Sequence, residues 1–109
     1  MKLKKIINSL SMMNFHQKRC ETEDFYEIVF FNKDQDEWNR IISAFLGAPI
    51  KAKGVEPSKK DLELTRESGS IRVEQTLFER EFDDEIIIAK FWPWQDDIHT
   101  TLRMSYLEK

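Results

Sequence analysis

The sequence predicts an α+β fold in which one or two helices pack on a mainly antiparallel sheet of about five strands, forming a two-layer sandwich. Three observations lead to this prediction. A strongly amphipathic helical pattern occupies residues 34–47, extended apolar patterns recur between residues 25 and 106, and short turn signals separate them. The expected order is α-β-α-β-β-β-β.

Length and composition define the class of protein. A chain of 109 residues is the size of a single domain, so residues 1–109 are taken as one α+β domain with a basic segment at 1–20 and a core at 24–109. The formal net charge of −3 argues against a dedicated nucleic-acid binder, which usually carries a basic excess. No stretch reaches the roughly 20 apolar residues of a membrane helix. One cysteine, Cys20, favours a reducing, cytoplasmic location.

The basic amino-terminal segment contains a helical pattern. Leu3, Ile6, Ile7, Leu10 and Met13 recur at three- and four-residue steps, which places them on one face of a helix. No capping residue precedes them, so a packed helix and a disordered arm both remain open. Residues 15–24 are expected to be a polar connection.

The next two elements are a strand and a helix. Residues 25–31 have apolar side chains at both alternating sets of positions, which is typical of a strand covered on both faces. The helix at 34–47 begins with Asp34 and Glu37 at the spacing of a capping box, and Gly47 marks its end. Its apolar stripe consists of Trp38, Ile41, Ile42, Phe45 and Leu46.

Residues 49–60 contain two prolines, one glycine and four lysines, so they are expected to form a linker on the surface. Residues 61–82 are interpreted as two strands around a turn at 67–70. An alternative is that Ser58 and Asp61 cap a short helix.

A hairpin is expected around residues 83–85, and its register can be predicted from the side-chain pattern. An odd-length loop would place Phe82 opposite Ile86 and Leu77 opposite Phe91, whereas an even loop would place Leu77 opposite Lys90. Cross-strand neighbours share a face, and the odd loop keeps one face apolar. We therefore expect the odd loop. Residues 98–106 then form a strand with one buried face.

Two tryptophans flank Pro93. The residue before a proline is held extended, so Trp92 and Trp94 are expected on the same face, which also carries Ile86 and Ile88. The helix at 34–47 can cover the opposite face. The Trp92 face needs its own cover, because a large exposed apolar patch is unusual on a monomer. Three covers are considered: the amino-terminal helix at 3–13, a second copy or protein partner, and a small molecule.

No catalytic signature, cofactor motif or metal-ligand pattern is recognised, so whether the chain is an enzyme stays open, with the balance against catalysis. The predicted function is a small cytosolic protein-binding or interaction module, with an unknown protein partner or a second copy as its ligand. The alternative is a small enzyme or small-molecule-binding domain. The candidate binding residues are Trp92, Trp94, Asp96, Asp97 and His99.

Two groups of basic residues support a further hypothesis. The first twenty residues contain Lys2, Lys4, Lys5, Lys18 and Arg19 and no acid, and four more lysines lie between residues 51 and 60. The simplest interpretation is that the acids downstream of residue 20 balance them. The alternative interpretation is that they bind an anionic partner such as RNA or an acidic protein.

Overall fold

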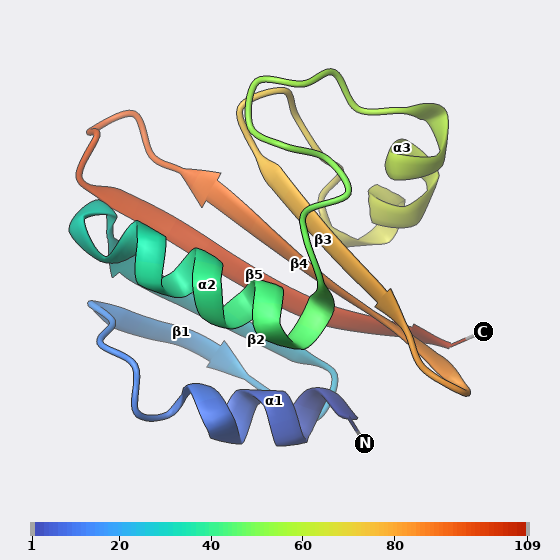
Figure 1. Ribbon diagram of the computed structural model, residues 1–109, viewed down its shortest axis with the longest axis horizontal. Helices are drawn as coiled ribbons and strands as arrows, with labels where there is room; N and C mark the ends of the chain where they lie inside the picture. The colour runs from blue at the N-terminus through green and yellow to red at the C-terminus, as the bar shows by residue number, and fades with distance from the viewer. Residues whose placement is uncertain (1, 109) are drawn as a thin grey trace.

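The computed structural model describes residues 2–108 and contains one five-stranded sheet in which all neighbouring strands run antiparallel (Figure 1). The strands are β1 (Gln17–Glu21), β2 (Phe25–Phe31), β3 (Thr76–Glu81), β4 (Glu85–Pro93) and β5 (His99–Glu108). Their order across the sheet is β1-β2-β5-β4-β3. Within residues 2–108 the helices are α1 (Lys2–Leu10), α2 (Gln35–Leu46) and α3 (Lys59–Thr65), with 3₁₀ turns η1 (Asn32–Asp34) and η2 (Arg66–Ser68). The predicted α+β class and antiparallel sheet are confirmed, with one more helix than expected.

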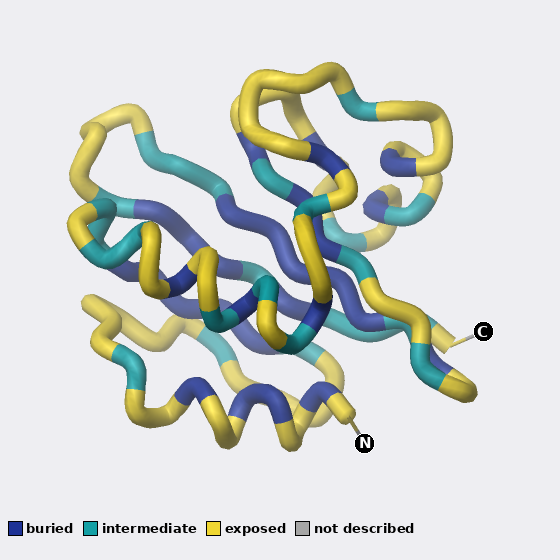
Figure 2. Tube along the Cα trace, in the orientation of Figure 1, coloured by how far each residue is buried: buried dark blue, intermediate teal, exposed yellow. Residues whose placement is uncertain are grey.

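Helices α1 and α2 lie over the same face of the sheet, which we call the inner face (Figure 1). Trp38 of α2 stacks on Phe30 of β2 with ring centroids 5.3 Å apart. Figure 2 shows buried positions recurring along both helices, with exposed positions between them, as amphipathic helices require. The main core consists of Leu3, Ile6, Ile7, Leu10, Tyr26, Ile28, Phe30, Trp38, Ile42, Leu46, Phe78, Ile87, Ala89, Phe91, Leu102 and Met104.

The amino-terminal helix is confirmed as a packed element, but it does not cover the Trp92 face. Leu3 and Leu10 are fully buried in the same inner-face core that contains Phe91. Trp92 lies on the opposite, outer face, because adjacent strand residues alternate. A carboxylate distant in sequence holds the start of α1. The backbone N–H of Lys2 donates to Glu85 at 3.0 Å, which places a negative charge at the positive end of the helix.

Residues 15–24 are not only a connection, because β1 occupies 17–21 and pairs with β2. The strand was missed because its side chains are almost all polar. It is an edge strand, and four of its five residues are exposed, so there is little apolar alternation to recognise. A β-bulge between Lys18 and Cys20 leaves Arg19 as the extra residue.

The strand predicted at 61–66 is wrong, and the alternative of a short capped helix is correct. The Ser58 hydroxyl accepts from the N–H of Asp61, and the Asp61 carboxylate accepts from the N–H of Ser58, both at 3.0 Å. These two bonds form a complete capping box at the start of α3. The capping box expected at Asp34 is absent, since α2 begins after η1 and the Asp34 side chain makes no cap hydrogen bond.

The odd hairpin loop is also wrong. Leu77 lies opposite Lys90 and Glu81 lies opposite Ile86, which is the even register. The N–H of Phe82 donates to the carbonyl of Glu85 at 2.8 Å, so the turn itself is residues 83 and 84. The expectation failed because it assumed that a lysine could not share a buried face with leucine.

Part of the outer face is covered by the segment between residues 52 and 75, which contains α3 and η2 (Figure 1). Ile71 and Leu64 from this segment pack against Leu77 and Ile88 of the sheet. The predicted surface linker is therefore partly wrong. Lys51 at its start is only 2% exposed and forms an isolated bridge with Leu77.

Candidate functional site

The outer face stays open at the end of the sheet where β4 finishes. Trp92 lies opposite Thr101 of β5, and Trp94 follows directly after the strand. The indole N–H of Trp94 donates to the Thr101 hydroxyl at 2.8 Å, so both tryptophans face the same side, as Pro93 predicts. Both are partly exposed.

A groove of about 490 Å³ lies between these tryptophans and the neighbouring strands. Its lining includes Trp92, Trp94, Arg19 and Arg103. The Arg103 guanidinium lies 5.1 Å from the centre of the Trp92 ring, and that of Arg19 lies 5.6 Å from the Trp94 ring. These are cation–π distances, so each arginine is held by its contact with an indole. The groove therefore combines apolar walls with fixed hydrogen-bond donors.

The groove carries more positive than negative charge. Glu27, which is 8% exposed, accepts from Nε of Arg103 at 2.7 Å and lies 3.6 Å from Nη1 of Arg19. Lys90 lies opposite Arg103 in the sheet. Burial, reinforced by the positive charge of Arg103, lowers the pKa of Lys90 to about 8, so its ammonium stays charged at neutral pH. Two arginines of the groove thus contact one carboxylate, while the Lys90 ammonium is buried beside Arg103 and does not line the groove.

The loop after Trp94 contains the other three predicted site residues, and none of them lines the groove. The Asp96 carboxylate accepts from the backbone N–H of Ile98 at 2.8 Å and of His99 at 3.0 Å, and Oδ2 lies 2.6 Å from Nδ1 of His99. The His99 hydrogen bond is the main reason that the pKa of Asp96 falls to about 2. Asp97 is exposed, with a left-handed φ of 59°. Asp96 therefore shapes the loop.

His99 is surrounded by aromatic rings on the outer face. Its ring centroid lies 4.8 Å from that of Trp94, 5.2 Å from that of Phe31 and 5.1 Å from that of His16. Of the predicted site residues, Trp92 and Trp94 form walls of the groove. His99 packs against Trp94, and Asp96 orders the loop.

Sequence reasoning missed Arg103 as a site residue, and it noted Arg19 only as a member of the amino-terminal basic cluster. Arg103 stands at an outward position of a predicted strand, and its register with Glu27 would have indicated a cross-strand ion pair. Arg19 gives no such signal, because the bulge that directs it depends on the pairing of β1 with β2.

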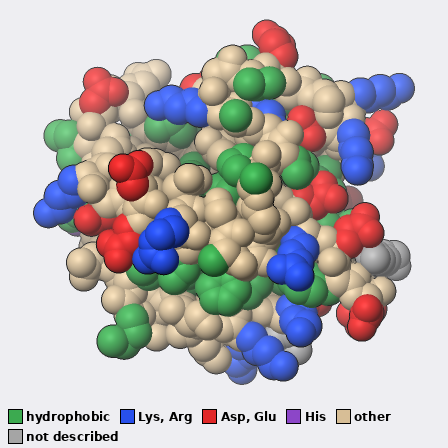
Figure 3. Space-filling view, viewed as in Figure 1, with side chains coloured by type: hydrophobic (Ala, Val, Ile, Leu, Met, Phe, Trp, Pro, Cys, Tyr) green, Lys and Arg blue, Asp and Glu red, His purple; other side chains and the backbone are tan. Residues whose placement is uncertain are grey.

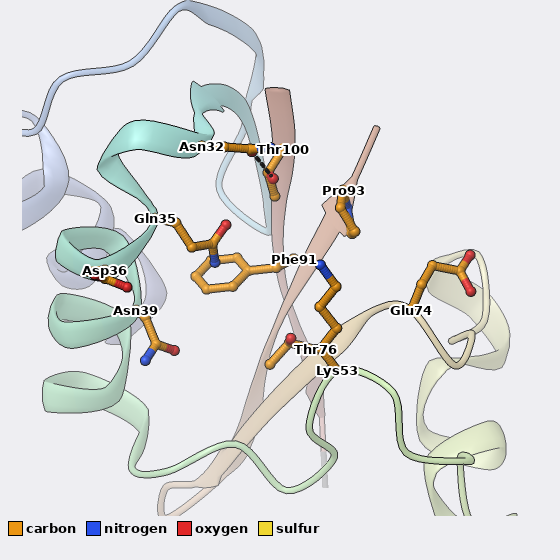
Figure 4. Close-up of a pocket in the computed structure, with 10 residues that line it drawn as sticks. All are labelled: Asn32, Gln35, Asp36, Asn39, Lys53, Glu74, Thr76, Phe91, Pro93 and Thr100. Atoms are coloured by element: carbon orange, nitrogen blue, oxygen red, sulfur yellow. Dashed lines mark hydrogen bonds between the residues drawn. The ribbon is translucent and has the colours of Figure 1, made fainter. Parts of the chain in front are cut away.

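A second pocket, of about 370 Å³, lies on the inner face at the same end of the sheet (Figure 4). Amide side chains come from η1 and α2, and threonines come from β3 and β5. These residues are Asn32, Gln35, Asn39, Thr76 and Thr100. None was singled out in the sequence, where the only signal is the four-residue spacing of Gln35 and Asn39 on one helix face.

Among residues 2–108, no three His, Cys, Asp or Glu side chains gather closely enough to hold a metal ion. None of the helices in that range is long and apolar enough to cross a membrane. Comparison of the chain with family models, with curated proteins and with solved structures finds no match.

Proposed function

We propose that the chain is a protein-interaction module whose outer-face groove binds an acidic segment of a partner protein. The observation that carries the proposal is the groove itself, in which two partly exposed indoles alternate with two arginines. Tryptophan and arginine are the residues most enriched among those that dominate binding energy at protein interfaces. The groove lies on the part of the outer face that the segment 52–75 leaves open.

The charge of the groove favours an acidic partner over a second copy of the chain. Among the residues that line the groove, Arg19 and Arg103 oppose the single carboxylate of Glu27, which leaves an excess of one positive charge. A symmetric dimer through this face would bring two such excesses together, because a two-fold interface uses the same patch on both subunits. Carboxylates of a partner would instead bind the guanidinium N–H groups and neutralise the excess.

A cytosolic location belongs to the same proposal. Cys20 is a free, partly exposed thiol in β1, and a reducing compartment keeps such a thiol from oxidation. A labelled chain followed in intact cells should distribute through the cytosol. Accumulation in an oxidising compartment would contradict this part of the proposal.

The proposal is tested with a synthetic peptide of Asp, Glu and Phe and a control in which Lys replaces each acid. Tryptophan emission should change with the acidic peptide and not with the basic one, because Trp92 and Trp94 line the groove. The effect should weaken as salt is added, since the groove is open to solvent. Equal responses to the two peptides would contradict an acidic partner.

Matched variants locate the binding. Arg19→Gln removes a positive charge from the groove, and Lys18→Gln removes one from the adjacent residue, whose ammonium pairs with Glu21. Only Arg19→Gln should weaken binding of the acidic peptide. Sedimentation tests whether the groove instead binds a second copy of the chain. A native dimer that becomes a monomer in Trp92→Ala would show that it does.

A small enzyme is the second candidate function, and one observation favours it. The Asp96 carboxylate orients the His99 ring at 2.6 Å, an arrangement that general bases use. His99 is, however, packed among Trp94, Phe31 and His16. Screening hydrolase and transferase substrates with the native chain and with His99→Gln would test this function, and an activity lost only in the variant would support it.

A further inference from the structure

The pocket on the inner face presents hydrogen-bonding groups that the protein itself does not use. Within residues 2–108, the side chains of Gln35, Asn39 and Thr76 form no hydrogen bond with the protein. Each amide offers two N–H donors and one carbonyl acceptor, and each hydroxyl both donates and accepts. The pocket therefore presents donors and acceptors in similar numbers.

The remaining polar groups and the base of the pocket are held in place. The Thr100 hydroxyl donates to the Asn32 side-chain oxygen at 2.6 Å, which leaves the Asn32 amide protons free for another acceptor (Figure 4). Phe91, at the base, makes edge-to-face contacts with Phe30 and Phe78 at 5.5 Å and 5.2 Å. Pro93 adds a second apolar surface beside it. A ligand would thus meet a rigid apolar base and polar walls.

The charged residues of the pocket do not select a charged ligand. Lys53 extends into the pocket in Figure 4, whereas Asp36 and Glu74 line opposite sides, so two acids oppose one base. All three are exposed, and water and salt screen their fields. The less exposed lining residues, among them Gln35 and Thr76, are uncharged.

From this geometry we infer that the inner-face pocket binds a neutral, polyhydroxylated small molecule of the size of a sugar. A sugar hydroxyl donates and accepts as the pocket does, and a C–H group of a sugar ring can contact the partly exposed Pro93, while the buried Phe91 closes the base beneath it. A volume of about 370 Å³ is at the small end of the range for ligand sites, which suits one or two sugar rings. The site is distinct from the groove, and its ligand does not depend on the proposed function.

The test is a titration of the isotope-labelled protein, followed by NMR at the side-chain amides of Asn32, Gln35 and Asn39. The solutes are glucose, galactose, N-acetylglucosamine and inositol, with acetate, phosphate and glycine as charged comparators. Uncharged polyols should give saturable shifts at these amides and leave the indole signals of Trp92 and Trp94 in place. The variant Gln35→Leu should raise the Kd about three- to tenfold, the effect of one lost hydrogen bond.

Two further variants make the result decisive. Arg40→Leu on α2 changes an exposed residue outside the pocket lining and should leave the Kd unchanged. Thr76→Val removes the hydroxyl that β3 contributes to the same pocket and keeps the side-chain shape. It therefore tests the site even where Gln35→Leu does not fold. Tighter binding of acetate, phosphate or glycine than of any polyol would overturn the inference, as would no binding at all. A Kd unaffected by Thr76→Val and by a folded Gln35→Leu would place the ligand elsewhere and also overturn it.

Discussion

The Lys90 ammonium is buried on the outer face, where it donates to the backbone carbonyls of Ser68 and Ser70. Gly69 between them has a left-handed φ of 96°, and a Cβ there would lie 3.0 Å from the Arg103 guanidinium. A side chain at this point would crowd the Arg103 guanidinium, and the left-handed φ also favours glycine. A local pattern of apolar residues contains no information about such carbonyls, which explains why the hairpin register was predicted incorrectly.

Lys90 should make stability depend on pH in the alkaline range. Its pKa is about 8 in the folded chain, lowered mainly by burial and then by Arg103, against 10.5 as the ordinary value. Between these values the unfolded chain holds a proton that the folded chain lacks, so raising the pH favours folding. Denaturant unfolding of the native chain and of Lys90→Met should show the native chain gaining free energy of unfolding relative to the variant from about pH 8 upwards. A difference independent of pH would mean that the ammonium keeps its ordinary pKa.

Within the candidate site, the direction of the tryptophans could be predicted from the sequence, and the partner of His99 could not. Pro93 fixes the geometry of its neighbours, so the shared direction of Trp92 and Trp94 follows from local rules. The partner of His99 does not follow from such rules. Asp97, two residues away, would share its face in an extended chain, but the loop turns at Asp97 and brings Asp96 to the ring instead.

At the scale of elements, the segment 52–75 is attached to the sheet by two buried lysines. The Lys51 ammonium donates to the carbonyls of Ala52, Val73 and Gln75 at 3.0, 2.8 and 2.5 Å, and Lys90 holds the turn at 68–70. Burial lowers the pKa of Lys51 as well. Its three hydrogen bonds join the two ends of the segment, so α3 is held over the outer face although it has few apolar residues.

Removing the Lys51 ammonium should loosen this segment. In Lys51→Met, buried carbonyls lose their donor, and the free energy of unfolding should fall by about 1 to 3 kcal/mol. Hydrogen exchange should accelerate in residues 52–75 more than in β2 and β5. Lys53→Met, at an exposed position two residues away, is the control and should change little. Equal loss of protection across the whole sheet would contradict a local attachment.

Elements with their own periodicity were predictable, and those that depend on a distant partner were not. The Trp38 stripe of α2 and the apolar alternation of β2 and β5 are properties of the local sequence. The edge strand β1 is recognisable only from its pairing with Val29 and Ile28, and α1 is stabilised at its start by Glu85 from β4. The even turn between β3 and β4 likewise depends on a distant partner, because the Lys90 ammonium needs the carbonyls of Ser68 and Ser70.

At the scale of the whole molecule, the sheet is covered unequally. Two helices cover the inner face, while the segment 52–75 covers only the β3–β4 part of the outer face. The strand end that carries Phe91 and Trp92 therefore has a polar pocket on one face and a groove rich in tryptophan and arginine on the other, and Pro93 lines both. This end of the sheet is where binding is expected. Figure 3 shows Lys and Arg side chains elsewhere on the inner-face side, around α1, and these are the competing basic surface.

The most direct measurement is an NMR titration of the acidic peptide that follows the three indole N–H signals. Trp92 and Trp94 line the groove, whereas Trp38 is fully buried and donates to the carbonyl of Asn14 at 3.1 Å. The peptide should shift the signals of Trp92 and Trp94 and leave that of Trp38 unchanged. Shifts confined to Lys2, Lys4 and Lys5, with all three indoles unmoved, would contradict the groove as the binding surface.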